Sequence, residues 1–283
     1  MAGISVLAPA KLNLFLHIVG KRQDGYHLLE SLVVFTEFGD RLEVFPAHML
    51  SLEITGQFAN DLQESIETNH VLKAARLLQP YAGGQGARIM LHKSIPTGAG
   101  LGGGSSDAAA AIRVLCELWN ILPAKKILQD IALNIGSDVP VCLEGTSAIM
   151  SGIGEVVSPV NLKEYPYVLL INPRKPLLTA SVYKQFSGAF AGAGFSIRGS
   201  LFDSLGGTYN MLESPATALM PVLKDILSAV KSTKGCRLAR MSGSGATCFG
   251  LYDTQEEAQA AKAALASQYQ DAWYMITRIK NGR

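Results

Sequence analysis

The feature that most constrains this chain is a glycine-rich segment that lies between a predicted strand and a predicted helix. Five glycines fall within seven residues of the sequence Pro96-Thr97-Gly98-Ala99-Gly100-Leu101-Gly102-Gly103-Gly104-Ser105-Ser106. Glycine lets the backbone approach a ligand closely, and the helix start that follows presents unpaired N–H groups and the positive end of its dipole. A turn that only caps a helix needs one or two glycines. The segment therefore predicts a loop that holds a polyanion such as the triphosphate of ATP.

Other kinds of phosphate-binding loop fit this segment less well. A Walker A loop needs a lysine directly after its last glycine, and Ser105 stands there instead. Gly98, Gly100 and Gly103 nominally spell the Rossmann pattern GxGxxG, but that pattern needs an acidic residue at the end of a strand about 20 positions further on, and here a helix is predicted, followed by Leu122-Pro123. The HRD and DFG sequences of protein kinases are absent. The rival class is a nucleotide sensor or a dinucleotide-dependent oxidoreductase, which predicts NAD(H) binding without ATP turnover.

Two charged residues stand alone beside apolar runs. Lys11 is the only charge between Leu7 and Leu16, and Asp138 precedes the apolar run that follows Gly136-Ser137. Taken alone, Lys11 is explained equally well as a surface lysine at a strand edge. Asp138, taken alone, is explained equally well as an aspartate in a turn. Together they predict phosphoryl transfer, because a carboxylate beside a lysine stays ionised, accepts a bond from a hydroxyl and directs it at a γ-phosphate.

Two further loops have the composition of a binding site. Asp24-Gly25-Tyr26-His27 reads as a turn between strands, or as a cleft rim on which Tyr26 and His27 contact a ring. The later sequence from Met241 to Phe249 contains a second Gly-Ser-Gly turn. It is either a simple hairpin turn or a second backbone loop that faces the same phosphates.

Composition argues for a folded globular protein of one large domain or two ordinary ones. Of the 283 residues, 48% are hydrophobic and 17% are charged, with a formal net charge of only +2. No stretch concentrates lysine and arginine, so we expect no nucleic-acid partner. The four cysteines form no CxxC pair, which favours free thiols. A basic region before an apolar run is missing at the N-terminus, and no apolar run is long enough for a membrane span, so we expect a cytoplasmic protein.

Hydrophobic periodicity predicts a mixed α and β chain with antiparallel strand pairs. The expected strands lie within 5–19, 30–45, 50–54, 87–92, 165–171, 237–241, 247–252 and 273–279, with a hairpin over 146–160. Helices are expected to start at Asn69, at about Thr179 and near Pro221, and one is expected to span 124–135. Another helix is expected to run to Trp119 from a cap among Ser105, Ser106 and Asp107. The last is expected to run to Gln268 from a capping box formed by Thr254 and Glu257.

Three of these segments, in this order, resemble the motifs of the GHMP kinases. They are the sequence from Pro9 to Leu14, the glycine-rich loop, and the sequence from Met241 to Ala246. Asp24-Gly25-Tyr26-His27 and the sequence from Gly136 to Pro140 resemble the branch of that family that acts on a cytidine-diphosphate-linked methylerythritol. The resemblance spans the chain from residue 8 to about residue 250.

The resemblance implies an α+β fold in two domains. Residues 1–160 would form the N-terminal GHMP kinase domain, which is like domain 2 of ribosomal protein S5, and residues 161–283 a ferredoxin-like C-terminal domain. It also implies ATP-dependent phosphorylation of a 2-hydroxyl in non-mevalonate isoprenoid synthesis, with ATP and Mg²⁺ required. A GHMP kinase for another small alcohol is the alternative. Neither the oligomeric state nor a protein ligand for Mg²⁺ follows from the sequence.

Site residues carry over from the resemblance by position. Lys11 and Asp138 would be the catalytic pair. The implied ATP contacts are Pro96, Thr97, Gly98, Ala99, Gly100, Leu101, Gly102, Gly103, Gly104, Ser105 and Ser106 of the loop, with Asn69 and Lys93 near the adenine. The implied substrate contacts are Asn13, Tyr26, His27 and, in preference to Phe186, Tyr183. Some relatives have Asn where this chain has Asp107, and we expect Asp107 to point away from the phosphates as a helix cap.

Overall fold

The structure, a computed structural model, describes residues 3–282 and divides into two compact units. The first unit consists of Met1–Ala10, Gly39–Thr97 and Gly102–Gly145, and the second of Lys11–Phe38, Gly98–Leu101 and Thr146–Arg283. Both the first strand and the long strand β3 therefore contribute residues to both units. The predicted division of the chain at residue 160 stays a prediction.

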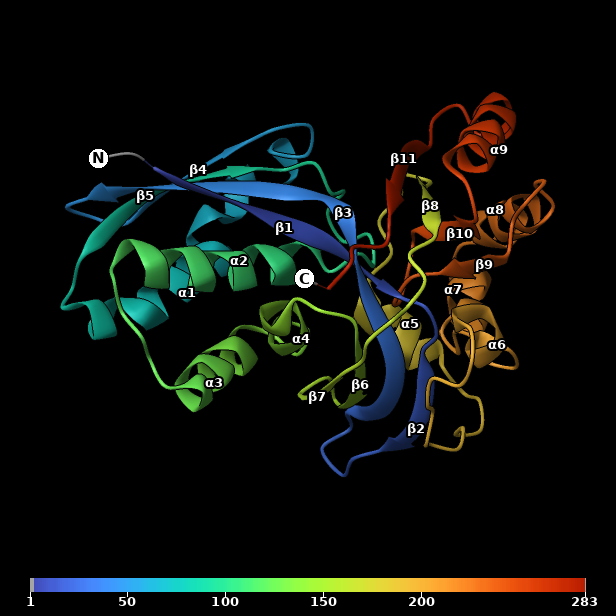
Figure 1. Ribbon diagram of the computed structural model, residues 1–283, viewed down its shortest axis with the longest axis horizontal. Coiled ribbons are helices and arrows are strands. Elements are labelled where there is room, and N and C mark those ends of the chain that lie inside the picture. The colour runs from blue at the N-terminus through green and yellow to red at the C-terminus, as the bar shows by residue number, and fades with distance from the viewer. Residues whose placement is uncertain (1–2, 283) are drawn as a thin grey trace. The chain divides into compact units, whose positions relative to one another are not determined.

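The first unit packs helices on a sheet (Figure 1). Its strands are β1 (Ile4–Asn13), the later part of β3 (His27–Ala47), β4 (Ser51–Thr55) and β5 (Gly86–His92). Its helices are α1 (His70–Leu78), α2 (Gly103–Leu118), α3 (Lys125–Ile135) and α4 (Val139–Glu144), with 3₁₀ turns η1 (Asn60–Thr68) and η2 (Gln79–Ala82). β5 pairs antiparallel with β3 and parallel with β4.

Helix α2 is the element of the first unit that positions the glycine-rich loop. The run Ala108–Ala111 is completely buried, because small side chains let the helix approach its neighbours closely. The predicted start of α1 is confirmed, since the Asn69 side chain accepts a hydrogen bond from Val71 N at 2.9 Å. The predicted cap of α2 is wrong. The helix begins at Gly103, and Gly102 occupies the cap position with φ 62°, so Ser105 lies inside the helix.

The second unit contains a four-stranded antiparallel sheet in the order β11-β8-β10-β9. The four strands of this sheet are β8 (Tyr167–Asn172), β9 (Leu238–Met241), β10 (Cys248–Tyr252) and β11 (Trp273–Arg278). The unit also contains β2 (His17–Lys21), the first part of β3, β6 (Ala148–Gly152) and β7 (Val156–Pro159). Its helices are α5 (Thr179–Gln185), α6 (Leu201–Leu205), α7 (Glu213–Leu219), α8 (Val222–Lys231) and α9 (Gln255–Gln268). Strand β8, helices, β9 and β10, helix α9 and β11 follow one another in this order, which is the βαββαβ arrangement of a ferredoxin-like domain and confirms that prediction.

The predicted elements of the second unit mostly form where the sequence placed them. Thr254 and Glu257 make the reciprocal capping box at the start of α9. The single strand expected within residues 5–19 is wrong, because β1 ends at Asn13 and β2 begins at His17. Leu16 leaves the strand to exchange backbone hydrogen bonds with residues 209 and 211, a partner segment far away in the sequence.

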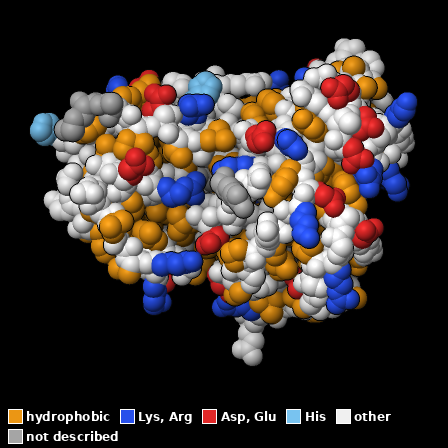
Figure 2. All heavy atoms as spheres, viewed as in Figure 1, with side chains coloured by type: hydrophobic (Ala, Val, Ile, Leu, Met, Phe, Trp, Pro, Cys, Tyr) orange, Lys and Arg blue, Asp and Glu red, His pale blue; other side chains and the backbone are white. Residues whose placement is uncertain are grey.

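The distribution of surface charge and the length and polarity of the helices relate to the expectations about a nucleic-acid partner and a membrane span. On the face that Figure 2 shows, lysine and arginine side chains lie scattered among aspartate and glutamate, without a continuous basic track. Among residues 3–282, every helix is too short or too polar to cross a bilayer. The four cysteines are free, and Cys142 and Cys248 are buried.

Candidate active site

The backbone of the glycine-rich loop takes a conformation that glycine alone adopts easily. Gly98, Gly100 and Gly102 have φ angles of 59°, 74° and 62°, all in the left-handed region. At Gly100 there is also no room for a side chain, because a Cβ atom would lie 2.7 Å from the carbonyl oxygen of Gly245 and closer still to that of Ser242. The alternation of left-handed glycines leaves a bare backbone that leads directly into the N–H groups at the start of α2.

The Gly-Ser-Gly turn between β9 and β10 packs against the centre of this loop. Thr247 N donates a hydrogen bond to Ala99 O at 3.1 Å, and Ser242 Oγ donates one to Gly100 O at 2.8 Å. Ser242 Oγ in turn accepts a hydrogen bond from Asn13 N at 3.3 Å. The turn joins the antiparallel strands β9 and β10, as the hairpin interpretation predicted, and it also contacts the glycine-rich loop. That it faces the phosphates stays a prediction.

Lys11 lies at the end of β1 and is 3% exposed. Its Nζ donates to Asn13 Oδ1 at 3.0 Å, and its backbone N–H donates to Leu101 O at 2.8 Å. The amide of Asn13 is itself fixed, because Nδ2 donates to Ser31 Oγ at 2.8 Å. A buried ammonium needs such partners, so the structure shows Asn13 orienting Lys11. The predicted contact between Asn13 and the substrate stays a prediction.

Asp138 precedes α4 and is half-buried. It occupies the N-cap position of this six-residue helix, but its side chain accepts no capping hydrogen bond from the helix backbone, so it is not an ordinary capping aspartate. Asp138 belongs to the first unit and Lys11 to the second. Their action as a catalytic pair therefore stays a prediction.

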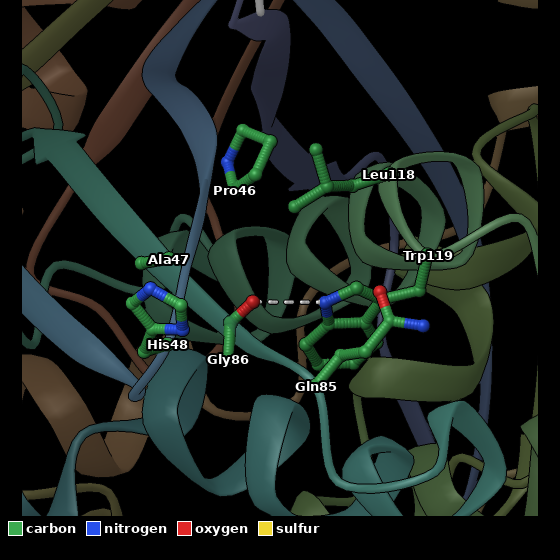
Figure 3. A pocket seen from close by; sticks show the side chains of 7 residues that line it. All are labelled: Pro46, Ala47, His48, Gln85, Gly86, Leu118 and Trp119. Carbon is green, nitrogen blue, oxygen red and sulfur yellow. Dashed lines mark hydrogen bonds between the residues drawn. The ribbon is translucent and has the colours of Figure 1, made fainter.

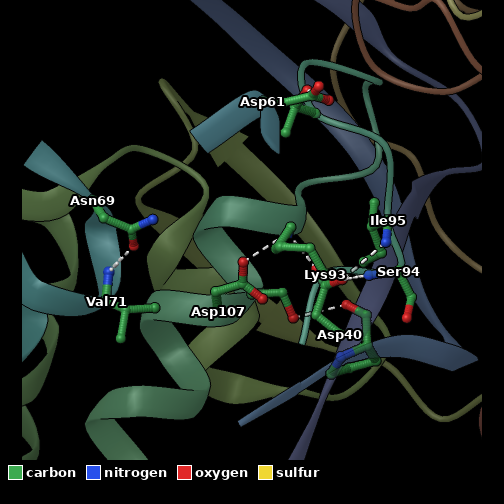
Figure 4. A network of polar contacts seen from close by, with 11 residues as sticks. Asp40, Asp61, Asn69, Val71, Lys93, Ser94, Ile95 and Asp107 are labelled. Carbon is green, nitrogen blue, oxygen red and sulfur yellow. Dashed lines mark hydrogen bonds and ion pairs between the residues drawn. The ribbon is translucent and has the colours of Figure 1, made fainter. Parts of the chain in front are cut away.

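Three ionisable side chains form a buried cluster behind the start of α2 (Figure 4). The Lys93 ammonium forms ion pairs with Asp40 and with Asp107, the latter at 2.8 Å. The expectation that Asp107 caps the helix is wrong, because it lies in the second turn of α2 and points back at Lys93. Attraction to an ammonium in a dry interior outweighs capping.

Other predicted ATP contacts have partners within the first unit. Ser106 Oγ donates to Pro9 O at 2.7 Å, and the Asn69 carbonyl caps α1. Thr97 Oγ1 donates to Asp61 at 2.7 Å. These three side chains are therefore already engaged within the protein. The contacts of Asn69, Lys93 and the loop with a nucleotide stay predictions.

The predicted aromatic contacts do come together in the second unit. The rings of His27 and Tyr183 stack with centroids 5.4 Å apart and an angle of 26° between planes. Phe186 meets the same histidine edge-on at 5.8 Å, so both aromatic candidates contact it. Tyr26 is 62% exposed. Burial, followed by the charge of Lys21, lowers the pKa of His27, so its ring is neutral at physiological pH.

Sequence reasoning missed two residues that organise the site. Asp40 holds Lys93 and accepts hydrogen bonds from Ser94 N at 2.6 Å and Ile95 N at 2.8 Å. Glu30 is buried, and its two carboxylate oxygens accept the N–H groups of Gly194 and Phe195 at 2.9 and 3.1 Å. Glu30 opens an apolar stretch of the predicted strand 30–45, whereas Asp40 lies between Gly39 and Arg41 with other acidic residues nearby, so no isolated charge marks it in the sequence.

A small cavity lies away from this site, and none of the predicted site residues lines it. It measures about 200 Å³ and is lined by Pro46, Ala47, His48, Gln85, Gly86, Leu118 and Trp119 (Figure 3). The indole N–H of Trp119 donates to Gly86 O at 3.1 Å, so the polar edge of its ring is already satisfied within the protein.

Comparison with known proteins agrees with this geometry. The descriptions "GHMP kinases N terminal domain" and "GHMP kinases C terminal" match residues 69–146 and 198–271. The chain is 47% identical to a 4-diphosphocytidyl-2-C-methyl-D-erythritol kinase of Paramagnetospirillum magneticum, over 97% of this chain and 98% of that protein. It is 42% identical to the protein of the same name from Parvibaculum lavamentivorans, over 97% of each chain.

Solved structures give the same result. The crystal structure of a 4-(cytidine 5'-diphospho)-2C-methyl-D-erythritol kinase matches with a TM-score of 0.81 at 34% identity, over 98% of this chain and 100% of that one. A homoserine kinase from Cytophaga hutchinsonii matches with a TM-score of 0.76 at 19% identity, covering 99% of this chain and 96% of that one, which shows a shared fold. With both domains matched and relatives similar over nearly their full length, this chain belongs to the GHMP kinase family.

Proposed function

We propose that this chain transfers the γ-phosphoryl group of ATP to the 2-hydroxyl of 4-diphosphocytidyl-2-C-methyl-D-erythritol, giving the 2-phosphate and ADP. The observation that carries the proposal is the loop of left-handed glycines that leads into α2, in a chain 47% identical to a kinase of that name. This reaction is a step of the non-mevalonate isoprenoid pathway. Both reactants are charged, water-soluble molecules, so we place the reaction in the cytoplasm.

Lys11 and Asp138 are proposed as the catalytic residues. Asp138 accepts the proton of the substrate hydroxyl, the hydroxyl oxygen forms a bond to the γ-phosphorus, and the bond from that phosphorus to the oxygen of ADP breaks. The Lys11 ammonium stabilises the negative charge that develops on the transferred group. The Asn13 amide supports this role, because it holds the ammonium in one orientation.

The glycine-rich loop is proposed to bind the triphosphate through its backbone N–H groups and the dipole of α2. The proposed ATP contacts are Pro96 to Ser106, with Asn69 and Lys93 nearer the adenine. Residues 3–282 contain no group of three or more His, Cys, Asp or Glu side chains that would hold a metal ion. Mg²⁺ would accompany ATP, where it would neutralise negative charge on the phosphates.

The cytidine end of the substrate is proposed to bind at the aromatic cluster of the second unit. His27 and Tyr183 already stack on each other, and Tyr26 is exposed beside them in the sequence. A neutral histidine offers one donor and one acceptor to a base, and Tyr183 offers a ring face. Asn13 completes the proposed substrate contacts.

A coupled assay of ADP release over a panel of alcohols tests the proposed function. We expect kcat/KM for the cytidyl substrate to exceed that for homoserine or mevalonate by about 10⁴-fold, because the paired aromatic and polar groups recognise the cytidine. Equal rates with a simple alcohol would favour the alternative, a GHMP kinase for another substrate. Binding of NAD(H) in a fluorescence titration, without ADP release, would favour the oxidoreductase class.

A further inference from the structure

The cluster of Lys93, Asp40 and Asp107 contains two carboxylates and one ammonium in a dry interior. Their exposed fractions are 2%, 0% and 2%. Side chains of this kind are rarely buried without full pairing, since each unpaired charge is costly away from water. If all three were ionised, the cluster would hold one negative charge with no counter-charge among residues 3–282.

The two carboxylates are not equally well held (Figure 4). Asp40 accepts hydrogen bonds at both oxygens, from Ser94 N and Ile95 N at Oδ1 and from Lys93 at Oδ2. Asp107 accepts from Lys93 at Oδ2 and shares a side-chain hydrogen bond with Asp40, while its Oδ1 is buried without a hydrogen-bond partner. Donors to a carboxylate favour its charged form. Asp40 is therefore the charged partner of Lys93, and Asp107 is the member that gains or loses a proton.

The cluster lies directly behind the first residue of α2. A Cβ atom on Gly103 would lie 3.3 Å from Lys93 Nζ and 3.5 Å from Asp40 Oδ2. Gly103 opens the helix whose N–H groups are proposed to bind the phosphates. Electrostatic interactions over such distances in a protein interior are only weakly screened. A change of charge in the cluster therefore acts on whatever anion the helix start holds.

We propose that Asp107 is a positioning residue for ATP: it shares the Lys93 ammonium with Asp40 behind the start of α2, and its charge state sets how strongly the loop binds the phosphates. This inference rests on the proposed ATP-dependent function. With Asp107 neutral, the charges of Lys93 and Asp40 cancel and the helix dipole acts unopposed. With Asp107 ionised, a net negative charge lies behind the phosphates and weakens their binding.

The electrostatics of the cluster support this assignment. Burial raises the pKa of Asp107 to about 8. The positive charge of Lys93 partly opposes this rise, and the negative charge of Asp40 adds to it. Burial lowers the pKa of Lys93, but the charges of Asp107 and Asp40 more than offset this, and the net direction is upward. Lys93 therefore stays charged, and ATP binding is expected to weaken as the pH rises through the pKa of Asp107.

Other titratable groups on the elements that pack against α2 do not pair with Asp107. They are His70, Lys73 and Arg76 on α1, Lys125, Lys126 and Asp130 on α3, and Asp138 and Glu144 at the ends of α4. Among the described residues, Asp107 interacts electrostatically with Lys93 and Asp40 only. His70 lies near Gly104, and burial, then Lys73, lowers its pKa, so it is neutral over the relevant range.

The test is the pH dependence of ATP binding in the intact chain and in its Asp107→Asn variant. Calorimetry with Mg²⁺-ATP gives Kd, and the coupled assay gives kcat and KM for each substrate. We expect Kd and KM for ATP of the unmodified chain to rise about tenfold between about pH 7 and about pH 9.5, with little change in KM for the alcohol. Asp107→Asn, which keeps the shape and stays neutral, removes this rise. Asp130→Asn, which removes an exposed charge from α3, keeps it.

The outcomes separate the inference from the proposed function. An unchanged pH dependence in Asp107→Asn, or none in the unmodified chain, would overturn the role of Asp107 while leaving the kinase activity in place. The Asp107→Ala variant tests for a purely structural role of Asp107. Such a role would lower kcat and thermal stability at every pH without flattening the pH dependence of Kd and KM for ATP. If the unmodified chain binds no ATP at all, the proposed function fails and this inference fails with it.

Discussion

At the residue scale, the candidate site is made of side chains whose orientation depends on partners far away in the sequence. Lys11 is held by Asn13, which is held by Ser31, and Ser242 joins the end of β1 to Gly100. Each buried polar group lacks water to bond to, so it keeps the one orientation in which its partner is met. Orientation of this kind is what phosphoryl transfer requires, because the protein contributes positioning and charge rather than covalent chemistry.

The proposed base predicts a specific kinetic defect. Asp138→Asn keeps the shape of the side chain but cannot accept the hydroxyl proton, so kcat should fall by about 10²-fold or more. Its Kd for ATP, measured by calorimetry, should stay within about twofold of that of the unmodified chain. Full turnover in this variant would remove Asp138 from the mechanism.

The buried cluster predicts a pH dependence of stability. The pKa of Asp107 is raised in the folded chain, so its stabilising contribution is complete below its unfolded value near 4 and is lost as the pH rises through about 8. Across that window the free energy of unfolding falls by at most about 1.4 kcal/mol per pH unit because of this group. Asp107→Asn should therefore gain stability relative to the unmodified chain as the pH rises, in urea unfolding. A constant difference would show that Asp107 does not titrate in this window.

How much of the site the sequence could predict follows from the same contacts. Lys11, Asp138 and the loop could be singled out as candidates, because isolated charges and clustered glycines are visible in a single segment, and their roles stay predictions. The role of Asp107 was predicted wrongly and Asp40 was missed, since their partner Lys93 lies 14 and 53 positions away. Nothing local reveals that these three side chains meet in one buried cluster.

At the element scale, the glycine-rich loop and the turn between β9 and β10 behave as one structure. Gly100 O accepts the Ser242 hydroxyl, and Ala99 O accepts Thr247 N. Ala99 and Leu101 of the loop are buried, and the left-handed glycines beside them are held by the turn and by the helix that follows. The start of α2 was hard to predict, because Gly102 caps the helix through its left-handed backbone, a property that several neighbouring glycines share.

This dependence predicts a difference between two substitutions in the same loop. Gly98→Ala and Gly100→Ala both place a side chain at a positive φ, which costs about 1–2 kcal/mol. A Cβ at Gly98 meets nothing within 4 Å, whereas one at Gly100 collides with the turn. We expect Gly100→Ala to raise KM for ATP at least about tenfold more than Gly98→Ala does. Similar KM values for the two variants would show that the turn does not shape the loop.

The capping box of α9 predicts a change in stability without a change in catalysis. Thr254 Oγ1 accepts the Glu257 N–H at 3.2 Å, and the Glu257 carboxylate accepts the Thr254 N–H at 3.2 Å. Thr254→Ala should lower the free energy of unfolding by about 1 kcal/mol, measured by urea unfolding. Its kcat should match that of the unmodified chain, and a loss of activity at full stability would contradict this assignment.

At the scale of the whole molecule, the fold and the family are those that the sequence predicted. The two compact units, however, are not two consecutive stretches of the chain. The strands of the second unit were predictable from local patterns, whereas their ferredoxin-like arrangement was implied by the resemblance to the GHMP kinases. The two units are each assembled from three separate segments, and β3 contributes to both. Sequence patterns report local periodicity, so they placed the strands of this chain but not the long-range pairing that groups them.

The central claim is that this chain phosphorylates one defined hydroxyl group. Phosphorus NMR of a mixture of the chain, Mg²⁺-ATP and 4-diphosphocytidyl-2-C-methyl-D-erythritol tests it directly. We predict a new phosphomonoester signal on carbon 2 of the methylerythritol, an intact diphosphate signal, and ADP in equal amount to the product. ADP without the monoester, or a phosphate on a different hydroxyl, would contradict the account.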